Sequence, residues 1–177
     1  MRNFASIGEV FELLVSKGET AYFGEPVTVL EHSLQAAWLA QQQDPEEALT
    51  VAALLHDLGH LMENADEDAA DRHVDTQHEE LGAEVLKKHL PAAVIEPIRL
   101  HVTAKRFLCF SDGHLFSCLS PASVQSLALH GGPMSANEAE EFSALPYAQN
   151  AMPFAVWTML PKSLGLRFRN WKAIVHS

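Results

Sequence analysis

Apolar residues recur at helical spacing along much of the chain. Over residues 6–17 they return every three or four positions, which predicts an amphipathic helix that ends near Gly18. A second helix is expected over residues 28–43, because Thr28 and Glu31 have the spacing of a capping box. The segment between these two helices is short and broken by glycine and proline, so it predicts a loop.

A third helix is expected to start at Asp44, with Pro45 at its first position and acidic residues at the positive end of the helix dipole. It would continue through the sequence AALLHDLGHL at residues 52–61 and would carry His56 and Asp57 within an apolar run. Buried polar groups are costly unless they find partners, so this run predicts a site and not an ordinary core helix.

The second half of the chain keeps the helical pattern. Pro91 and Pro97 are expected to bound short connections, and Ser135 with Glu138 forms a second capping-box pattern. We find no hairpin signal, internal repeat or low-complexity tract. The chain therefore predicts an all-α fold, with further helical segments over 76–90, 98–108 and 120–130.

Composition and charge narrow the class of protein. The 177 residues are 47% hydrophobic and contain no apolar run of membrane-spanning length, so we expect one globular domain without a membrane partner. The net charge of −11 argues against nonspecific nucleic-acid binding. Glu9 and Glu12 interrupt the N-terminal segment, which is unlike a signal peptide and predicts a cytoplasmic protein. Cys109 and Cys118 are expected to be free thiols.

Ten histidines are present, and their context separates them. Residues 63–74 are acidic and without a period, so His73 is expected in a solvated loop. Any single histidine in an apolar segment is compatible with a hydrogen-bonded core residue. Together, imidazoles and a carboxylate from four helices predict a metal site in a helical bundle. Ligands of these types can bind iron, manganese, zinc or cobalt. The candidate ligands are His32, His56, Asp57, His78 and His101.

The order of these ligands resembles the HD-domain superfamily, most of whose members are metal-dependent phosphohydrolases. In more detail the chain is similar to the mixed-valent diiron oxygenases of the organophosphonate-cleaving type. This resemblance covers roughly residues 8–145, and several independent motifs agree in order and spacing. The motifs are YFGEPVTVLEHSLQAAWLA, ALLHDLGH, QHEELGAEVL, HVTAKRFL, and LSPAS followed by GGPM.

The resemblance implies two iron ions, Fe2+ and Fe3+, in the core of the bundle. His32 and His56 would bind one ion, His78 and His101 would bind the other, and Asp57 would bridge them. Without the resemblance, the ligand types alone do not choose iron over other metals.

The resemblance also implies how substrate binds. Tyr22 would occupy the first iron until substrate arrives, and Glu25 would meet the amine end of the substrate. A lysine would favour the anionic phosphonate, as the carboxylate favours an ammonium group. Without the resemblance, Tyr22 could equally pack in the core and the lysine could be solvated. The residues implied at the phosphonate end are His60, Lys105, Ser123, Ser126 and His130.

The implied reaction is O2-dependent cleavage of the carbon–phosphorus bond of a 1-hydroxy-2-aminoethylphosphonate. The products would be phosphate and glycine, or glycine betaine if the amine is trimethylated. An HD-type phosphohydrolase of a small phosphate ester is the alternative, in which metal-bound water attacks. A metal-binding helical domain without catalysis is the third interpretation. The YFGE segment favours the oxygenase, since a hydrolase does not need it.

The chain departs from the family pattern in two places. His130 stands where the family has glutamine, and no LRRxDDxAK segment supplies the aspartate that closes the first iron site. By spacing, that aspartate falls at Thr158. If the reading frame is moved back by one base, the codons of residues 153–162 can be read as the sequence ALRRVDDAAKV. We therefore hypothesise that residues 1–152 form the HD domain and residues 153–177 are an out-of-frame tail.

Overall fold

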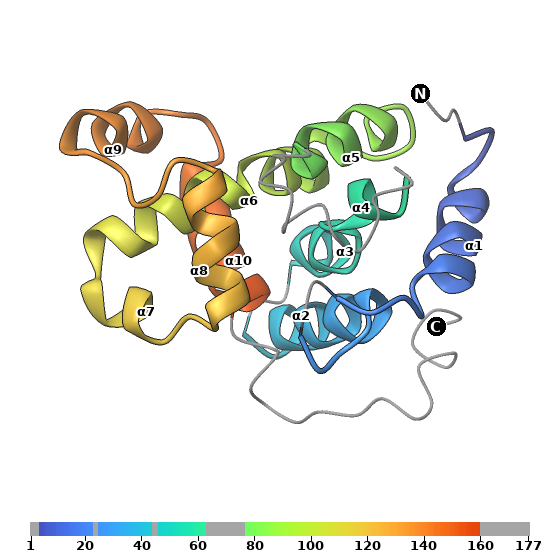
Figure 1. Ribbon diagram of the computed structural model, residues 1–177. Helices are drawn as coiled ribbons and strands as arrows, with labels where there is room; N and C mark the ends of the chain where they lie inside the picture. The colour runs from blue at the N-terminus through green and yellow to red at the C-terminus, as the bar shows by residue number, and fades with distance from the viewer. Residues whose placement is uncertain (1–3, 23–24, 44–45, 63–76, 160–177) are drawn as a thin grey trace.

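The structure is a computed structural model that describes residues 4–22, 25–43, 46–62 and 77–159. In these ranges the fold is helical, with one isolated β-bridge between Ala21 and Thr28 (Figure 1). The all-α prediction is confirmed. The helices are α1 (Ile7–Lys17), α2 (Val29–Gln43), α3 (Glu47–Leu55), α4 (Leu58–Met62), α5 (His78–Leu86), α6 (Ala92–Ser111), α7 (Gly113–Ser117), α8 (Pro121–Leu129), α9 (Ala136–Ser143) and α10 (Ala148–Met159).

Helix α3 lies in the middle of the bundle and packs against α2, α6 and α10. In Figure 1, α2 lies below it, α5 lies above it, and α1 closes the side next to α4. The long helix α6 also contacts α5 and α10, and at its far end it meets α7, α8 and α9. This arrangement brings segments from both halves of the chain around the end of α3.

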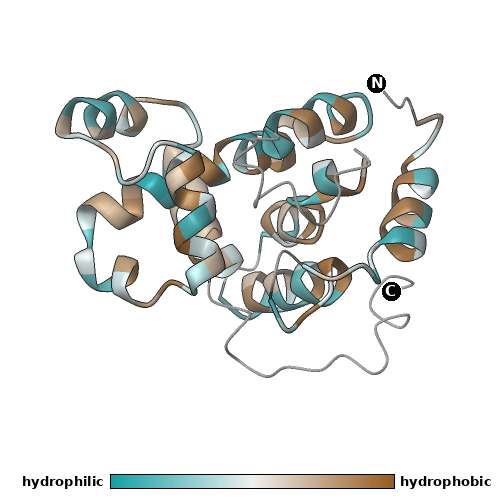
Figure 2. Cartoon of the chain, in the orientation of Figure 1, coloured by the Kyte–Doolittle hydropathy of each residue, from teal (hydrophilic) through white to brown (hydrophobic). Residues whose placement is uncertain are grey.

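Hydrophobic and hydrophilic residues alternate along the helices, as the brown and teal stretches of the cartoon in Figure 2 show, and many of the hydrophobic side chains are buried in the core. One large core is shared by α1 to α6 and α10, and a smaller one lies between α6, α9 and α10. Burial of this kind is the main stabilising term for helices of ordinary length. Residues that are almost fully buried in the large core include Leu34, Leu49, Leu55, Leu86 and Ile98.

Both predicted capping boxes are present. The Thr28 N–H donates to the Glu31 carboxylate at 2.9 Å, and the Glu31 N–H donates to the Thr28 hydroxyl at 3.1 Å. Ser135 and Glu138 exchange the same pair of bonds at the start of α9. Each box satisfies N–H groups that the first turn of a helix leaves without partners.

The prediction of one continuous helix through His56 and Asp57, which we call the HD pair, is wrong. Helix α3 ends at Leu55, His56 and Asp57 form a turn, and α4 begins at Leu58. In an unbroken helix, adjacent side chains point about 100° apart. In the structure His56 is the C-cap of α3, and its Nε2 atom lies 3.0 Å from the carboxylate of Asp57.

Pro97 was expected to bound a connection, and this prediction is wrong. It lies inside α6, in the second helical turn. A proline there removes one backbone hydrogen bond. The burial of Ile95, Ile98 and His101 on the same helix keeps the segment helical across it.

Some expectations lie outside the described residues. They are the cap at Asp44 and Pro45, the acidic loop at 63–74 with His73, and the tail at 160–177. Residues 153–159 are described, and they form the second half of α10. None of the described helices is both long and apolar enough to span a membrane.

Candidate metal centre

Four elements bring the five predicted ligands together at the end of α3. His32 comes from α2, His56 and Asp57 from the α3–α4 turn, His78 from the start of α5, and His101 from the middle of α6. Each of the five is at most 6% exposed. Such a set of charged and polar side chains in an apolar core requires partners for its buried atoms.

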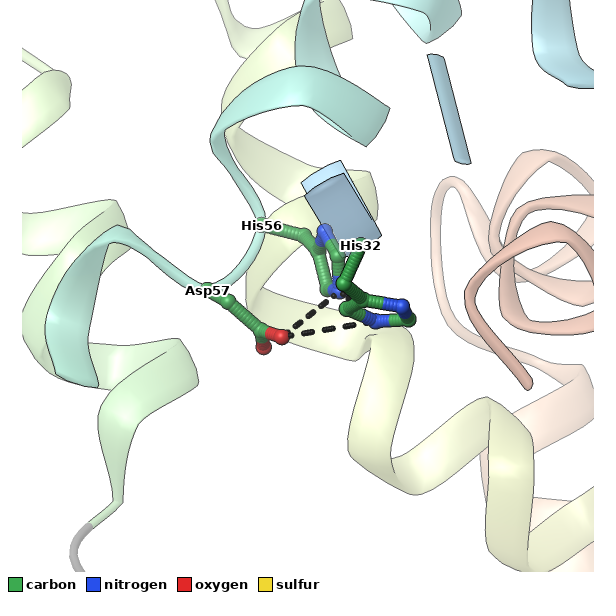
Figure 3. Close-up of side chains that lie close together, drawn as sticks. All are labelled: His32, His56 and Asp57. Carbon is green, nitrogen blue, oxygen red and sulfur yellow. Dashed lines mark hydrogen bonds and ion pairs between the residues drawn. The ribbon is translucent and has the colours of Figure 1, made fainter. Parts of the chain in front are cut away.

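Asp57 lies between two pairs of histidines. Its Oδ2 atom is 3.0 Å from His56 Nε2 and 3.5 Å from His32 Nε2, as the dashed lines in Figure 3 show. The two imidazole Nε2 atoms are 3.2 Å apart. His32, His56 and Asp57 form what we call the first triad.

The other carboxylate oxygen faces the second pair. Asp57 Oδ1 is 3.5 Å from His78 Nε2 and 4.0 Å from His101 Nε2, and these two nitrogens are also 3.2 Å apart. Asp57, His78 and His101 form the second triad. One carboxylate thus offers one oxygen to each triad, which is the geometry of a bridging ligand.

Backbone carbonyls orient two of the imidazoles. His56 Nδ1 donates to the Ala53 carbonyl at 2.9 Å, and His101 Nδ1 donates to the Ile98 carbonyl at 2.7 Å. With the proton on Nδ1, the lone pair of each ring lies on Nε2 and points into the cluster. Metal-binding histidines are held in this way in many proteins.

The electrostatics of the cluster keep its donors in the forms that bind a metal. Burial lowers the pKa of His101 to about 3, and burial with the neighbouring His60 lowers the pKa of His78 well below its usual value. Burial raises the pKa of the Asp57 carboxyl, but His56, His60 and His78 together lower it by more. The net pKa of Asp57 is therefore well below normal. At pH 7 the imidazoles of His78 and His101 are therefore neutral and Asp57 is a carboxylate.

These residues fit a pair of metal ions. In each triad two Nε2 atoms face each other at 3.2 Å, although two lone pairs at that distance repel. With its proton on Nδ1, His56 has no hydrogen at Nε2 to offer the buried Asp57 Oδ2, which is 3.0 Å away. A cation in each triad would satisfy all of these atoms at once, and imidazole with carboxylate suits iron, zinc and manganese.

The loop that contains Tyr22 and Glu25 folds back onto the first triad. The Tyr22 N–H donates to the Val27 carbonyl at 3.0 Å, beside the Ala21–Thr28 bridge. The Tyr22 ring then lies 4.4 Å from that of His32. Burial, the charge of Asp57 and a hydrogen bond to it raise the pKa of the Tyr22 phenol well above normal, so its hydroxyl stays protonated.

Three further predicted side chains lie near the second triad or the loop. His60 stacks on His78 with ring centres 3.8 Å apart, and the His130 ring centre is 6.1 Å from that of His78. Glu25 accepts a hydrogen bond from the Ser120 hydroxyl, which connects the loop to the start of α8. The second triad and the loop are therefore bordered by groups from α4 and both ends of α8.

The remaining predicted residues lie on α6 and α8. Lys105 follows His101 by one helical turn, and its charge contributes to the low pKa of His101, after burial and His56. Ser123 is buried on α8, and its N–H donates to the Ser120 hydroxyl at 3.1 Å. Ser126 lies one turn further, where its carbonyl accepts the His130 N–H at 3.2 Å.

The comparisons with known proteins agree with this geometry. Residues 29–108, which carry all five candidate ligands, match the HD domain family. A [1-hydroxy-2-(trimethylamino)ethyl]phosphonate dioxygenase (glycine-betaine-forming) from Leisingera caerulea is 44% identical over 140 residues, which is 79% of this chain and 70% of the relative. The chain belongs to the HD-domain phosphonate dioxygenase family. A second member of this family, a hydroxymethylphosphonate dioxygenase from Gimesia maris, is 41% identical over 162 residues, 91% of this chain and 80% of the relative.

Helix α10 carries Thr158, the position at which the resemblance to this HD-domain family predicts one more aspartate ligand. The Phe154 ring lies edge-on to His56 and to His101, with both pairs of ring centres 6.2 Å apart. Thr158 is one turn further along the same face of α10, is buried, and donates its hydroxyl to the Ala155 carbonyl at 3.0 Å. Among the described residues, the first triad has Asp57 as its only carboxylate.

The sequence did not predict three residues that contact or adjoin the predicted residues of this HD-domain site. Ser120 was expected only as a helix start, although it also bonds to Glu25. Arg106 was not singled out, although it directly follows Lys105. Glu79 was missed as well, and its carboxylate lies 3.4 Å from His78 Nδ1. The adjacency of the last two to predicted site residues was the available signal.

The low histidine pKa values predict that acid destabilises the metal-free protein. A group whose pKa falls on folding stabilises the fold above its unfolded pKa, and this stability is lost as the pH falls. For His101 the window runs from about 6.5 down to about 3. We expect the free energy of unfolding to fall as the pH drops below 6.5, by about 1 kcal/mol per pH unit for His101 and in the same direction for His78. Urea titrations at pH 7 and pH 5 measure this change, and equal stability at the two values would contradict it.

Proposed function

We propose that this protein uses two iron ions to cleave the carbon–phosphorus bond of a small 1-hydroxyphosphonate with O2. The observation that carries the proposal is the division of Asp57 between two histidine pairs, since it provides two adjacent ion sites with one bridging ligand. The folding of Tyr22 over His32 supports the oxygenase over the hydrolase, because that loop is part of the resemblance to the oxygenases alone.

The overall reaction balances without a further co-reactant. A hydroxyphosphonate dianion R–CH(OH)–PO3 and one O2 give a carboxylate R–COO, hydrogen phosphate and one proton. The hydroxyl-bearing carbon is oxidised by four electrons to the carboxylate, and O2 is reduced by the same four electrons. Iron, when bound, would supply the coordination of substrate and the activation of O2.

The side chains of the chain would bind and orient the substrate. Lys105 follows His101 by one turn of α6 and its charge acts on His101, so its ammonium group would attract the phosphonate dianion. The Glu25 carboxylate, bonded to Ser120, would face the other end of the substrate and favour a cationic nitrogen there. We therefore propose the 2-amino or 2-trimethylamino substrate over hydroxymethylphosphonate, with glycine or glycine betaine as the second product.

The test combines iron analysis with phosphate release in air and under nitrogen. Iron-loaded protein is given the three candidate phosphonates, and O2 uptake is measured together with phosphate. We expect phosphate in air only, one O2 consumed per phosphate, and faster turnover of the two aminated substrates. A phosphate ester is tested alongside them. Phosphate release from this ester at the same rate under nitrogen as in air would favour the hydrolase. Iron binding without turnover of any compound would favour a non-catalytic domain.

We further propose that the first triad is completed in the family by a carboxylate at the position of Thr158, and that the tail from residue 153 onward is out of frame. The position of Thr158 beyond Phe154, on the face of α10 that meets His56, supports this proposal. Sequencing the gene across the codon of Met152 tests it. An intact frame, with no sequence like LRRxDDxAK in the shifted register, would contradict it.

A variant tests the same position in the protein. Thr158→Asp should increase the affinity of the first triad for iron by about tenfold or more, as changes around metal ligands typically do. Thr158→Asn is the matched control, because it has the shape of aspartate without the charge. Iron titration of the three proteins measures the effect. If the aspartate variant binds no more tightly than the asparagine variant, position 158 does not supply a ligand.

A further inference from the structure

The turn after α8 carries His130 toward the second triad. His130 ends the helix, and Gly131 and Gly132 follow with positive φ values of 98° and 74°. The N–H of Gly132 returns to the Leu127 carbonyl at 2.9 Å. We call residues 130–132 the glycine turn. His130, His78 and Glu79 each place one donor atom within 4.8 Å of the others, so the turn borders the site directly.

Arg106 holds this turn from the neighbouring helix. Its Nε donates to the Gly132 carbonyl at 2.9 Å, and the N–H of Met134 donates to the Arg106 carbonyl at 3.4 Å. A Cβ atom on Gly131 would come within 3.4 Å of the guanidinium. The guanidinium and the backbone of the glycine turn are therefore in close contact, and a larger residue at position 131 would disturb it.

A second contact fixes the guanidinium itself. The other side of Arg106 donates to the Glu138 carboxylate at 2.7 Å. Glu138 is the acidic member of the capping box of α9, and its bonds to Ser135 and to Arg106 lower its pKa to about 2. Glu138 is thus charged at pH 7. A planar guanidinium with donors on two sides can hold a carbonyl and a carboxylate at once, whereas an ammonium group cannot reproduce this geometry.

We propose that Arg106 is a positioning residue that sets the location of His130 over the second triad, and thereby the affinity for the phosphonate group. This proposal deepens the proposed function and rests on it for the identity of the ligand. Arg106 lies on α6 with His101 and Lys105, so one rigid helix would place a metal ligand, the cation for the phosphonate, and the anchor of the glycine turn.

The first test measures binding without turnover. Hydroxymethylphosphonate is titrated into the iron-loaded protein under nitrogen, and its dissociation constant is measured by calorimetry. We expect Arg106→Gln to weaken binding by about tenfold with unchanged iron content, and Arg106→Lys to weaken it less. Lys87→Gln is the control, because Lys87 pairs with Glu84 on the exposed side of α5, and it should bind as the unchanged protein does. Equal affinities for all four proteins would overturn the proposal.

Non-additivity separates positioning from general stability. If Arg106 acts through His130, Arg106→Gln should have no further effect on affinity in a His130→Ala protein, since coupled residues are not additive. An arginine with a merely structural role would lower the affinity by the same factor in the unchanged protein and in the His130→Ala protein. Such additive losses would overturn the proposal.

A readout without any phosphonate keeps the test independent of the proposed function. In the zinc-loaded protein, the side-chain 1H–15N spectrum of the histidines reports the environment of His130. The His130 signals should shift in Arg106→Gln and stay in place in Lys87→Gln. Unshifted signals in Arg106→Gln would overturn the positioning role. Absence of phosphonate turnover alone would count against the proposed function and leave this result unaffected.

Discussion

Replacing Asp57 by asparagine is expected to remove metal from both triads at once. Its two oxygens lie 3.0 Å from His56 Nε2 and 3.5 Å from His78 Nε2, so one substitution removes the shared anionic ligand. We expect iron to fall from two ions per chain to fewer than one, and turnover to fall by roughly 100-fold or more, since even residues behind the ligands typically cost 10 to 100-fold.

Iron analysis and phosphate release measure this prediction. Asp112→Asn is the matched control, because Asp112 is exposed and caps α7 by accepting the His114 N–H, a role that asparagine also performs. The control should keep its iron and its turnover. An Asp57→Asn protein that still held two ions would show that Asp57 is not the bridging ligand.

Replacing Gly59 by alanine should disrupt the fold next to the second triad. A Cβ atom there would lie 2.1 Å from the His78 carbonyl oxygen and 2.8 Å from its Cα, so the start of α5 would have to move. Gly82 faces the same contact from α5, since its own Cβ would approach the Gly59 nitrogen to 3.4 Å. Overpacking of this kind costs about 1–3 kcal/mol, and more where backbone must shift.

Thermal unfolding and iron analysis together test the Gly59 prediction. For a chain of this size, about 3 kcal/mol corresponds to a melting temperature roughly 6–12 °C lower. His78 would be displaced as well, so the second ion should be lost. Gly113→Ala is the control, because a Cβ there meets nothing within 4 Å. A Gly59→Ala protein with unchanged melting temperature and iron content would contradict the close packing of α4 on α5.

The helices were predictable where local signals decide them. The capping boxes at Thr28 and Ser135 depend on residues three apart, and both are present. The break at the HD pair was not predictable from periodicity, because the apolar pattern continues across it. At that break Asp57 lies among imidazoles from α2, α5 and α6, and the periodicity of one segment does not report such tertiary neighbours. Pro97 is the converse case, since burial of its neighbours outweighs the local signal of a proline.

The five ligands were predictable because histidines in apolar helices are conspicuous, and the HD pair placed them in one site. Contacts between residues distant in sequence were not predictable. The bond between Ser120 and Glu25 spans 95 positions, and the bond between Arg106 and Glu138 spans 32. Neither pair has a spacing that a sequence pattern can report. The packing of α9 beside α6 brings Arg106 and Glu138 together, and the bond from Ser120 joins the start of α8 to the loop before α2.

The most direct test of the account is the location of bound iron. Crystals of iron-loaded protein would be measured at the iron absorption edge, where anomalous scattering locates each ion. We expect two peaks that share Asp57, one beside His32 and His56 and the other beside His78 and His101. A single peak, or peaks away from Asp57, would contradict the central claim that one carboxylate joins two metal sites.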